Sequence, residues 1–140
     1  MSDLTRLLAH EMAAGLRRGE FTSRALTEAH LDAAEAGNHA LNAWLTIDRE
    51  PALAQADAAD ARLAASAGDG AVAPGPGAPG AHPLLGVPVA LKDLVSVKGG
   101  QCTAGSRILE GYIAPYDAHI TERLRAVGAV ILGKTNMDEF

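Results

Sequence analysis

Cysteine, aromatic residues and lysine are scarce in this sequence, and each shortage narrows what the chain can be. The single cysteine, Cys102, excludes an internal disulfide framework, which fits a reducing compartment and predicts a cytoplasmic protein. Aromatic residues make up 4% of the 140 residues, whereas 29 residues are alanine. Because alanine supports helices but adds little buried area, the core must come from Leu, Ile and Val, which are concentrated in the last third of the chain.

Other absences exclude whole classes of protein. No apolar run approaches the roughly 18 residues that a membrane span needs, and no basic segment leads into an apolar run at the amino terminus, so we expect no signal peptide. The formal net charge of −5 arises within residues 1–70, which argues against a broad nucleic-acid surface. We predict no metal site, because the histidines lack ligand spacing. They stand at His10, His30, His39, His82 and His119.

The first half of the sequence has the periodicity of helices. Leucine and methionine recur at helical spacing between Asp3, which can cap a helix, and Gly19, which can end it. A second helix is predicted to begin at Thr22 or Ser23 and to stop near Gly37. Each helix has a narrow apolar stripe and a polar back, which is typical of an outer layer that covers another element.

A third helix and two connecting segments complete this half. Pro51 can occupy the first turn of a helix that runs to about Ala67. Before it, segment 41–47 is apolar and irregular, and its tryptophan is expected to pack against another element. After it, residues 68–83 are so rich in Pro and Gly that they predict a surface loop. This loop separates a helical layer, residues 1–67, from the rest of the chain.

Residues 84–140 have the pattern of the start of an α/β core. Continuous apolar runs at 87–91 and 129–132 predict two buried strands. Between them, Asp117 can cap a helix that Gly128 ends. Strand, helix and strand form a βαβ unit, whose strands lie parallel. Because two strands leave both faces and an edge of such a sheet uncovered, we expect the chain to be part of a larger α/β domain.

Residues 128–135, Gly-Ala-Val-Ile-Leu-Gly-Lys-Thr, match the phosphate-loop pattern. That chemistry needs a flexible loop between a strand and a helix, so that backbone amides face the phosphate. Here a predicted helix comes first, and the four middle residues are a strand-forming apolar run. We therefore predict a helix cap, a strand and a turn rather than a nucleotide site.

Lys92 is the side chain whose position most suggests chemistry. It directly follows the apolar run 87–91, at the carboxyl end of a predicted strand, where parallel-sheet proteins tend to place their active sites. An ammonium group held away from water has a lowered pKa and can act as a base. A strand-end lysine that reaches into solvent is the other interpretation, and composition alone does not separate the two.

Several segments, taken in order, resemble the amidase signature family. Residues 85–93, Leu-Gly-Val-Pro-Val-Ala-Leu-Lys-Asp, and residues 133–140, Gly-Lys-Thr-Asn-Met-Asp-Glu-Phe, carry most of the resemblance. Thr-Ala-Gly-Ser at 103–106, Pro-Tyr-Asp-Ala at 115–118 and Leu-Asn-Ala-Trp at 41–44 agree with it. Within the family, the Met-Asp-Glu-Phe and Tyr-Asp-Ala steps resemble the amidase-type subunits of tRNA-dependent amidotransferases.

The resemblance implies a fold and a catalytic mechanism. The fold is α/β: N-terminal helices and the first strands of a mixed sheet sandwiched between helices, so that residues 1–140 form an incomplete domain. The family uses a serine–cis-serine–lysine triad, and its lysine maps onto Lys92 as a catalytic residue. Both serines belong to a Gly/Ser-rich segment beyond Phe140, and neither Ser96 nor Ser106 matches their context.

The resemblance also implies partners, which are the B and C subunits of the amidotransferase. The whole protein would release ammonia from glutamine for the B subunit, which uses ATP and Mg²⁺ to amidate misacylated tRNA, while the small C subunit braces the pair. No cofactor is expected in the glutaminase itself, and no membrane contact.

Three other interpretations stay open. The chain could belong to a stand-alone amidase that acts on small amides. It could act only as a binding or scaffold piece, since a base without its nucleophile cannot carry out acyl transfer. Nucleotide binding at 128–135 would require ATP to protect the chain thermally, and we expect no such shift.

Overall fold

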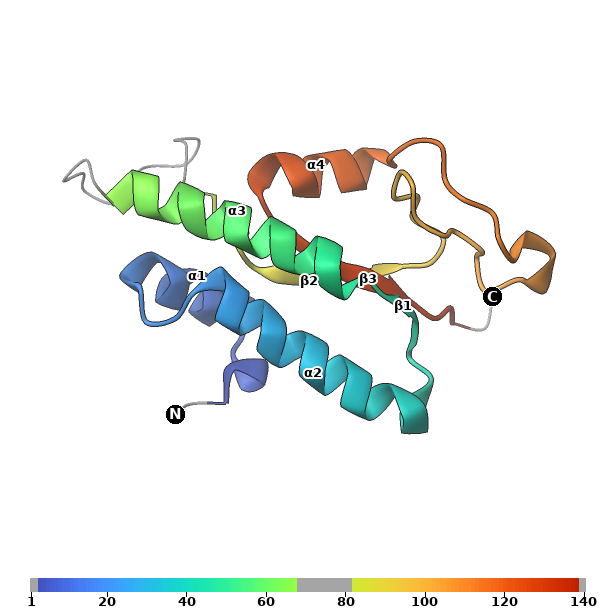
Figure 1. The fold of residues 1–140 in the computed structure, drawn as a ribbon, viewed down its shortest axis with the longest axis horizontal. Helices are drawn as coiled ribbons and strands as arrows, with labels where there is room; N and C mark the ends of the chain where they lie inside the picture. Colours follow the sequence, from blue (N-terminus) through green and yellow to red (C-terminus); the bar gives the residue numbers. More distant parts are fainter. Residues whose placement is uncertain (1–2, 68–81, 139–140) are drawn as a thin grey trace.

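The computed structural model describes residues 3–67 and 82–138 and shows helices packed around a small mixed sheet (Figure 1). In chain order the elements are η1 (Leu4–Arg6), α1 (Ala9–Arg18), α2 (Ser23–Leu41), β1 (Trp44–Ile47), α3 (Arg49–Ala67), β2 (Pro88–Lys92), η2 (Arg107–Leu109), α4 (His119–Val127) and β3 (Val130–Thr135). The predicted α/β class is confirmed.

The strand order in the sheet is β1-β3-β2, so the last strand along the chain lies in the middle. β2 pairs with β3 in parallel, with Pro88 opposite Val130 and Lys92 opposite Thr135. This confirms the two predicted strands and their parallel arrangement. β1 pairs with β3 antiparallel, which makes the sheet mixed. The apolar residues of β3 are buried, as expected for a central strand.

β1 lies within segment 41–47, for which the prediction of irregular structure is wrong. The strand passes very close to Gly133 of β3, whose φ is +150°. A Cβ atom on Gly133 would overlap the Thr46 carbonyl oxygen and lie 3.0 Å from the Ile47 Cα. Glycine therefore fits where another residue would push the two strands apart.

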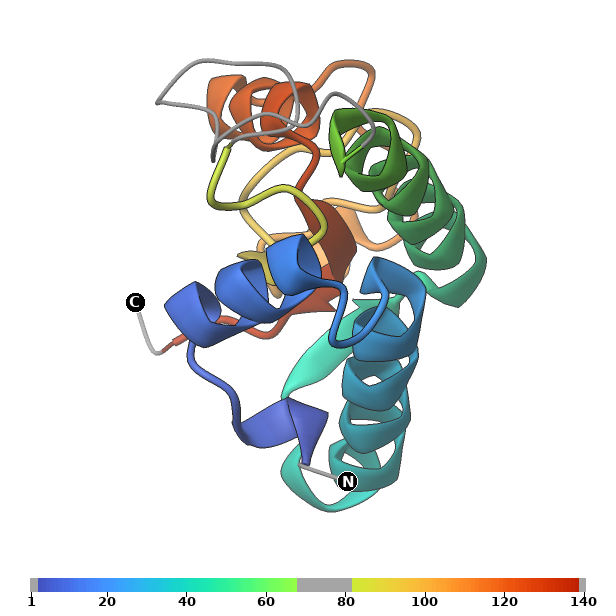
Figure 2. The same cartoon turned by 90° about the vertical axis from the view of Figure 1, so that its left-hand side faces the viewer.

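Helices α2 and α3 pack side by side against the sheet and build its core (Figure 2). One cluster joins both helices to β3, and Trp44 and Ile47 of β1 pack against it, as expected for the tryptophan. Its buried members are Leu31, Ala52, Leu53, Ala56, Val130 and Leu132. A second cluster joins α1 to α2 and to the start of β2, through Met12, Ala13, Leu16, Leu26 and Val87.

The prediction of one helix between Asp3 and Gly19 is wrong, because the chain forms two pieces. The Asp3 carboxylate accepts hydrogen bonds from the N–H and hydroxyl of Thr5, and so caps the short η1 instead. The second piece, α1, begins after Leu8, whose N–H donates to the Glu11 carboxylate at 2.7 Å. Gly19 ends α1 in the left-handed conformation, as predicted.

The second helix begins as predicted but ends later. The Thr22 hydroxyl accepts a hydrogen bond from the Ala25 N–H and caps α2. Gly37 lies inside the helix, which continues to Leu41. Asn42, not Gly37, takes the left-handed conformation that ends the helix, with φ 49°. Beside it the Asn38 side chain forms a local clamp: it bonds both the N–H and the carbonyl of Trp44, at 2.8 and 3.1 Å. This clamp fixes the helix end to the start of β1.

The predictions for the third and fourth helices can also be compared with the structure. α3 contains Pro51 in its first turn, as predicted. The predicted cap of α4 is wrong, since Ala118 occupies that position. Asp117 instead accepts a hydrogen bond from the Lys98 N–H at 2.7 Å and forms an ion pair with Arg125. It therefore ties the segment before α4 to the turn after β2.

Residues 68–81, most of the predicted loop 68–83, lie outside the described residues. At the end of that loop, the Gly86 N–H donates to the Gly128 carbonyl at 2.8 Å, so the chain enters β2 beside the end of α4. Among the helices that the structure describes, none is both long and apolar enough to cross a membrane.

Candidate active site

Lys92 lies at the carboxyl end of β2, as the sequence predicts. Its carbonyl accepts a hydrogen bond from the Val95 N–H at 2.9 Å, which turns the chain away from the sheet. The Lys92 side chain is 39% exposed, whereas Leu91 and Asp93 on either side are buried. Because successive side chains of a strand point to opposite faces, Lys92 faces the open side while its neighbours face the interior.

The ammonium group of Lys92 forms an ion pair with Asp138, which follows β3. The hydrogen bond from Lys92 lowers the pKa of the Asp138 carboxyl, and the positive charge acts in the same direction. The ion pair therefore links the end of β2 to the residues that follow β3.

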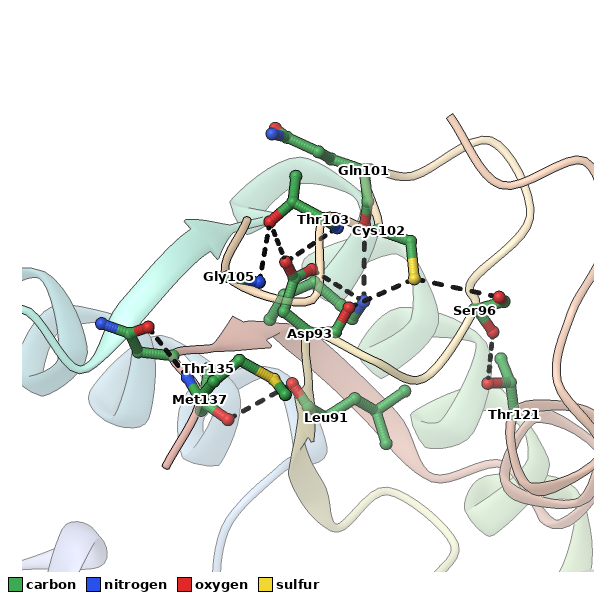
Figure 3. A network of polar contacts seen from close by, with 12 residues as sticks. Leu91, Asp93, Ser96, Gln101, Cys102, Thr103, Gly105, Thr121, Thr135 and Met137 are labelled. Carbon is green, nitrogen blue, oxygen red and sulfur yellow. Dashed lines mark hydrogen bonds and ion pairs between the residues drawn. The ribbon is translucent and has the colours of Figure 1, made fainter. Parts of the chain in front are cut away.

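Asp93, which follows Lys92 in the chain, forms a buried polar network with Lys134 and Thr103. Figure 3 shows the Asp93 carboxylate facing Thr103. The Lys134 Nζ lies 3.1 Å from the Asp93 Oδ1 and 3.4 Å from the Gln101 carbonyl oxygen. Thr103 donates to the Asp93 Oδ2 from its N–H at 2.9 Å and from its hydroxyl at 2.5 Å. Asp93 and Lys134 are only 1% and 2% exposed, so each compensates a charge that would otherwise be costly to bury.

Opposing effects set the pKa of Asp93. Burial raises it, because removal from water disfavours the charged carboxylate. The hydrogen bonds from Thr103, together with the hydrogen bond and positive charge of Lys134, lower it and prevail. Asp93 is therefore an ionised group that holds its neighbours.

The segment 102–106 encloses this network. The Cys102 thiol donates to the Asp93 carbonyl at 3.2 Å, and Ala104 and Gly105 both adopt positive φ angles. A Cβ atom on Gly105 would lie 2.9 Å from the Met137 Cγ, so this turn fits tightly against the chain after β3. The structure thus brings together the three segments 85–93, 103–106 and 133–138 around Asp93, the residue that follows Lys92.

Ser96 and Ser106 are engaged elsewhere. The Ser96 hydroxyl lies 3.9 Å from the Cys102 sulfur, and the Ser106 hydroxyl accepts a hydrogen bond from the Ile108 N–H. Within residues 3–67 and 82–138, no hydrogen bond joins a serine hydroxyl to Lys92. Within these described residues, the partner found for the Lys92 ammonium is therefore Asp138 and not a serine.

Residues 128–135 form a helix end and a strand. Gly128 ends α4 with φ +79°, and β3 comes next, which confirms the predicted cap and strand. The predicted turn at 133–135 is wrong, because the strand continues to Thr135. Lys134, the lysine of the phosphate-loop pattern, points into the buried network. Sequence reasoning missed this role, because the partner of Lys134 is set by the pairing of β2 with β3.

Two other features do not add to the site. A hollow of about 400 Å³ lies between α3 and the end of α4, and its lining includes Gln55, Arg62 and Arg125 but no residue near Lys92. Among the residues that the structure describes, no three His, Cys, Asp or Glu side chains gather as metal ligands would.

Comparison with known proteins defines the class to which this fold and site belong. The family model described as Amidase matches residues 25–140, which include Lys92 and the network around Asp93. The chain therefore belongs to the amidase family, and the resemblance of the sequence motifs is confirmed.

Individual relatives show which proteins of the family this chain is similar to. The A subunit of glutamyl-tRNA(Gln) amidotransferase from Streptomyces coelicolor is 49% identical over 140 residues, and the protein of the same name from Salinispora arenicola is also 49% identical. Both alignments cover the whole of this chain and 26% of the relative, so the chain spans about a quarter of these relatives' length. The solved peptide amidase of Stenotrophomonas maltophilia matches with a TM-score of 0.77 and 32% identity, over 96% of this chain and 25% of that one.

Proposed function

We propose that residues 1–140 are the N-terminal part of a single amidase domain, which acts as the glutaminase subunit of a tRNA-dependent amidotransferase. The observation that carries the proposal is Lys92: a half-exposed lysine at the end of a parallel strand, where three family segments converge. The relatives that share 49% identity over the whole chain bear the name of such a subunit, which favours this member of the family.

In this proposal neutral Lys92 is the base of a serine–cis-serine–lysine triad. It takes the proton of the bridging serine, which in turn takes the proton of the nucleophilic serine as that oxygen attacks the side-chain amide of glutamine. The new C–O bond forms, the C–N bond breaks, and the relay returns a proton to the leaving ammonia. Water then hydrolyses the acyl-enzyme to glutamate. Both serines would come from a later segment of the full-length protein.

The partners follow from the same proposal. Ammonia would pass to the B subunit, which uses ATP and Mg²⁺ to convert Glu-tRNA(Gln) to Gln-tRNA(Gln) or Asp-tRNA(Asn) to Asn-tRNA(Asn), while the C subunit braces the pair. The glutaminase would need no cofactor of its own. The net charge of −5 fits a protein that leaves tRNA contacts to a partner, and the single cysteine fits a cytoplasmic complex.

The structural match to a peptide amidase favours one second candidate, a stand-alone amidase that acts on small amides. The two candidates share the fold and the base. They differ in whether partner proteins accept the ammonia.

A chimeric enzyme separates the two candidates. In it, residues 1–140 of this chain replace the matching segment of the Streptomyces coelicolor relative, and it is assayed with the B and C subunits of that organism. We expect ammonia release from glutamine and formation of Gln-tRNA(Gln). In the full-length protein to which this chain belongs, assayed in the same way, hydrolysis of small amides without any tRNA amidation would favour the stand-alone amidase.

The 140-residue chain alone provides the control. Without a nucleophile it is expected to release no ammonia from glutamine. Measurable turnover by that chain would overturn the assignment of the triad.

A further inference from the structure

Asp93, the residue directly after Lys92, has both of its backbone polar groups fixed by distant parts of the chain. Its N–H donates to the Thr135 carbonyl at 3.1 Å. Its carbonyl accepts hydrogen bonds from the Cys102 thiol at 3.2 Å and from the Ala104 N–H at 3.4 Å. The backbone at the end of β2 is therefore tied both to β3 and to the loop before η2.

The carboxylate of Asp93 is bound from the same two directions. Lys134 of β3 donates to one oxygen, and Thr103 of the loop donates to the other from its N–H and its hydroxyl (Figure 3). The Thr103 hydroxyl oxygen also accepts a hydrogen bond from the Gly105 N–H, which fixes its orientation. Every polar atom of Asp93 is thus engaged within the chain.

Stability alone is a weak reason to bury such a pair. Replacing a buried ion pair by apolar side chains of similar volume is often neutral or stabilising, so the geometry that the pair imposes is the other role to consider. Here the geometry concerns Lys92. A lysine side chain has a limited reach from its Cα, so the region that its ammonium can occupy moves with that Cα. The network fixes the peptide on the carboxyl side of that Cα.

We propose that three positioning residues, Asp93, Lys134 and Thr103, hold the Lys92 Cα in place. The amine of Lys92 can then meet the bridging serine. This inference rests on the proposed function. It gives the two lysines of one site different roles: Lys92 exchanges a proton with the bridging serine, whereas Lys134 holds the Asp93 carboxylate in place.

The first test uses Thr103→Val and Thr103→Ser in the chimeric enzyme. Valine removes the hydroxyl at nearly constant volume and keeps the backbone hydrogen bond. Because small misplacements of a catalytic group are costly, we expect Thr103→Val to lower kcat for glutamine hydrolysis by about 10- to 100-fold, with KM changed less than about twofold. Thr103→Ser, which restores the hydroxyl, should return kcat to within about threefold of the parent.

Active-site titration separates positioning from folding. If the hydroxyl served stability alone, Thr103→Val would reduce the fraction of active enzyme but leave kcat per titrated site unchanged. That result would overturn the proposal.

A double variant tests the positioning role of the Asp93–Lys134 ion pair without leaving one buried charge unpaired. Asp93→Asn alone leaves the buried Lys134 ammonium without a charged partner and is expected to destabilise the fold. Combining Asp93→Asn with Lys134→Met removes both charges, and we expect a folded protein whose kcat stays about 10-fold or more below the parent. Parental kcat in the folded double variant would overturn the proposal.

Lys92→Ala, measured in parallel, distinguishes failure of the base from failure of the positioning network. Glutaminase activity that survives Lys92→Ala refutes the proposed function itself. Loss of activity in Lys92→Ala together with parental kcat in Thr103→Val refutes only the positioning role.

Discussion

Gly133→Ala is predicted to detach β1 from the sheet. The added methyl carbon would overlap the Thr46 carbonyl oxygen and lie 3.0 Å from the Ile47 Cα. Both are backbone atoms, which cannot rotate away as a flexible side chain could. The strands must therefore separate, and Trp44, which packs against the main core cluster from β1, must shift with them.

The expected cost has two parts. The φ of +150° at Gly133 belongs to a region that is almost restricted to glycine, and adopting it with a side chain costs about 1–3 kcal/mol. Forcing a methyl group into a closed contact costs about a further 1–3 kcal/mol. We expect the free energy of unfolding to fall by about 2–6 kcal/mol, a large share of the 5–15 kcal/mol that is roughly typical of a domain.

Urea unfolding of the 140-residue chain measures this loss. Far-UV circular dichroism follows the helices, and fluorescence of the single tryptophan, Trp44, reports on β1 itself. Gly99→Ala is the matched control, because Gly99 has φ +80° but no atom within 4 Å of an added Cβ. It should cost only about 1–2 kcal/mol. Equal losses in the two variants would refute the claim that the close approach of β1 requires glycine.

Two further predictions concern the core and the buried ion pair. Leu31→Ala should lower the free energy of unfolding by about 2–5 kcal/mol, because Leu31 is fully buried, whereas Leu41→Ala, at 75% exposure, should change it by about 0.5 kcal/mol or less in the same urea titration. The pKa of Asp93 is lower in the folded chain than its ordinary value of 3.8, so its stabilising contribution is present above about pH 4 and is lost as the pH falls through the folded value. Acid unfolding followed by circular dichroism should therefore be less steep below pH 4 in the Asp93→Asn, Lys134→Met variant than in the parent, and equal steepness would contradict the stabilising role of the Asp93 charge.

Local patterns in the sequence were sufficient to predict the elements that carry strong local signals. The central strands are continuous apolar runs, and Thr22, Gly19 and Gly128 cap helices because their own side chains or backbone freedom satisfy the helix ends. β1 was missed because it is a four-residue strand of partly exposed residues, with no alternation to mark it. The end of α2 was missed because the left-handed residue that ends it is Asn42, whereas Gly37, the more usual residue type for that role, lies inside the helix.

The candidate site, like the fold, was only partly predictable from the sequence. The place of Lys92 was predictable, because it follows directly from the length of the apolar run before it. The network beside it was not, because it depends on the register between β2 and β3 and on the path of the loop that brings Thr103 back. No local pattern at Asp93 or Lys134 reveals that one will be the partner of the other.

The role of Lys92 as the base is tested most directly by a single turnover of the chimeric enzyme with glutamine. Rapid quenching measures the rate of ammonia release as the acyl-enzyme forms. Lys92→Ala should lower this rate by about 10²- to 10⁴-fold, the contribution of a general base. Lys98→Ala, which removes a lysine in the turn that follows β2, should leave it unchanged. An undiminished rate in Lys92→Ala would contradict the assignment of the base.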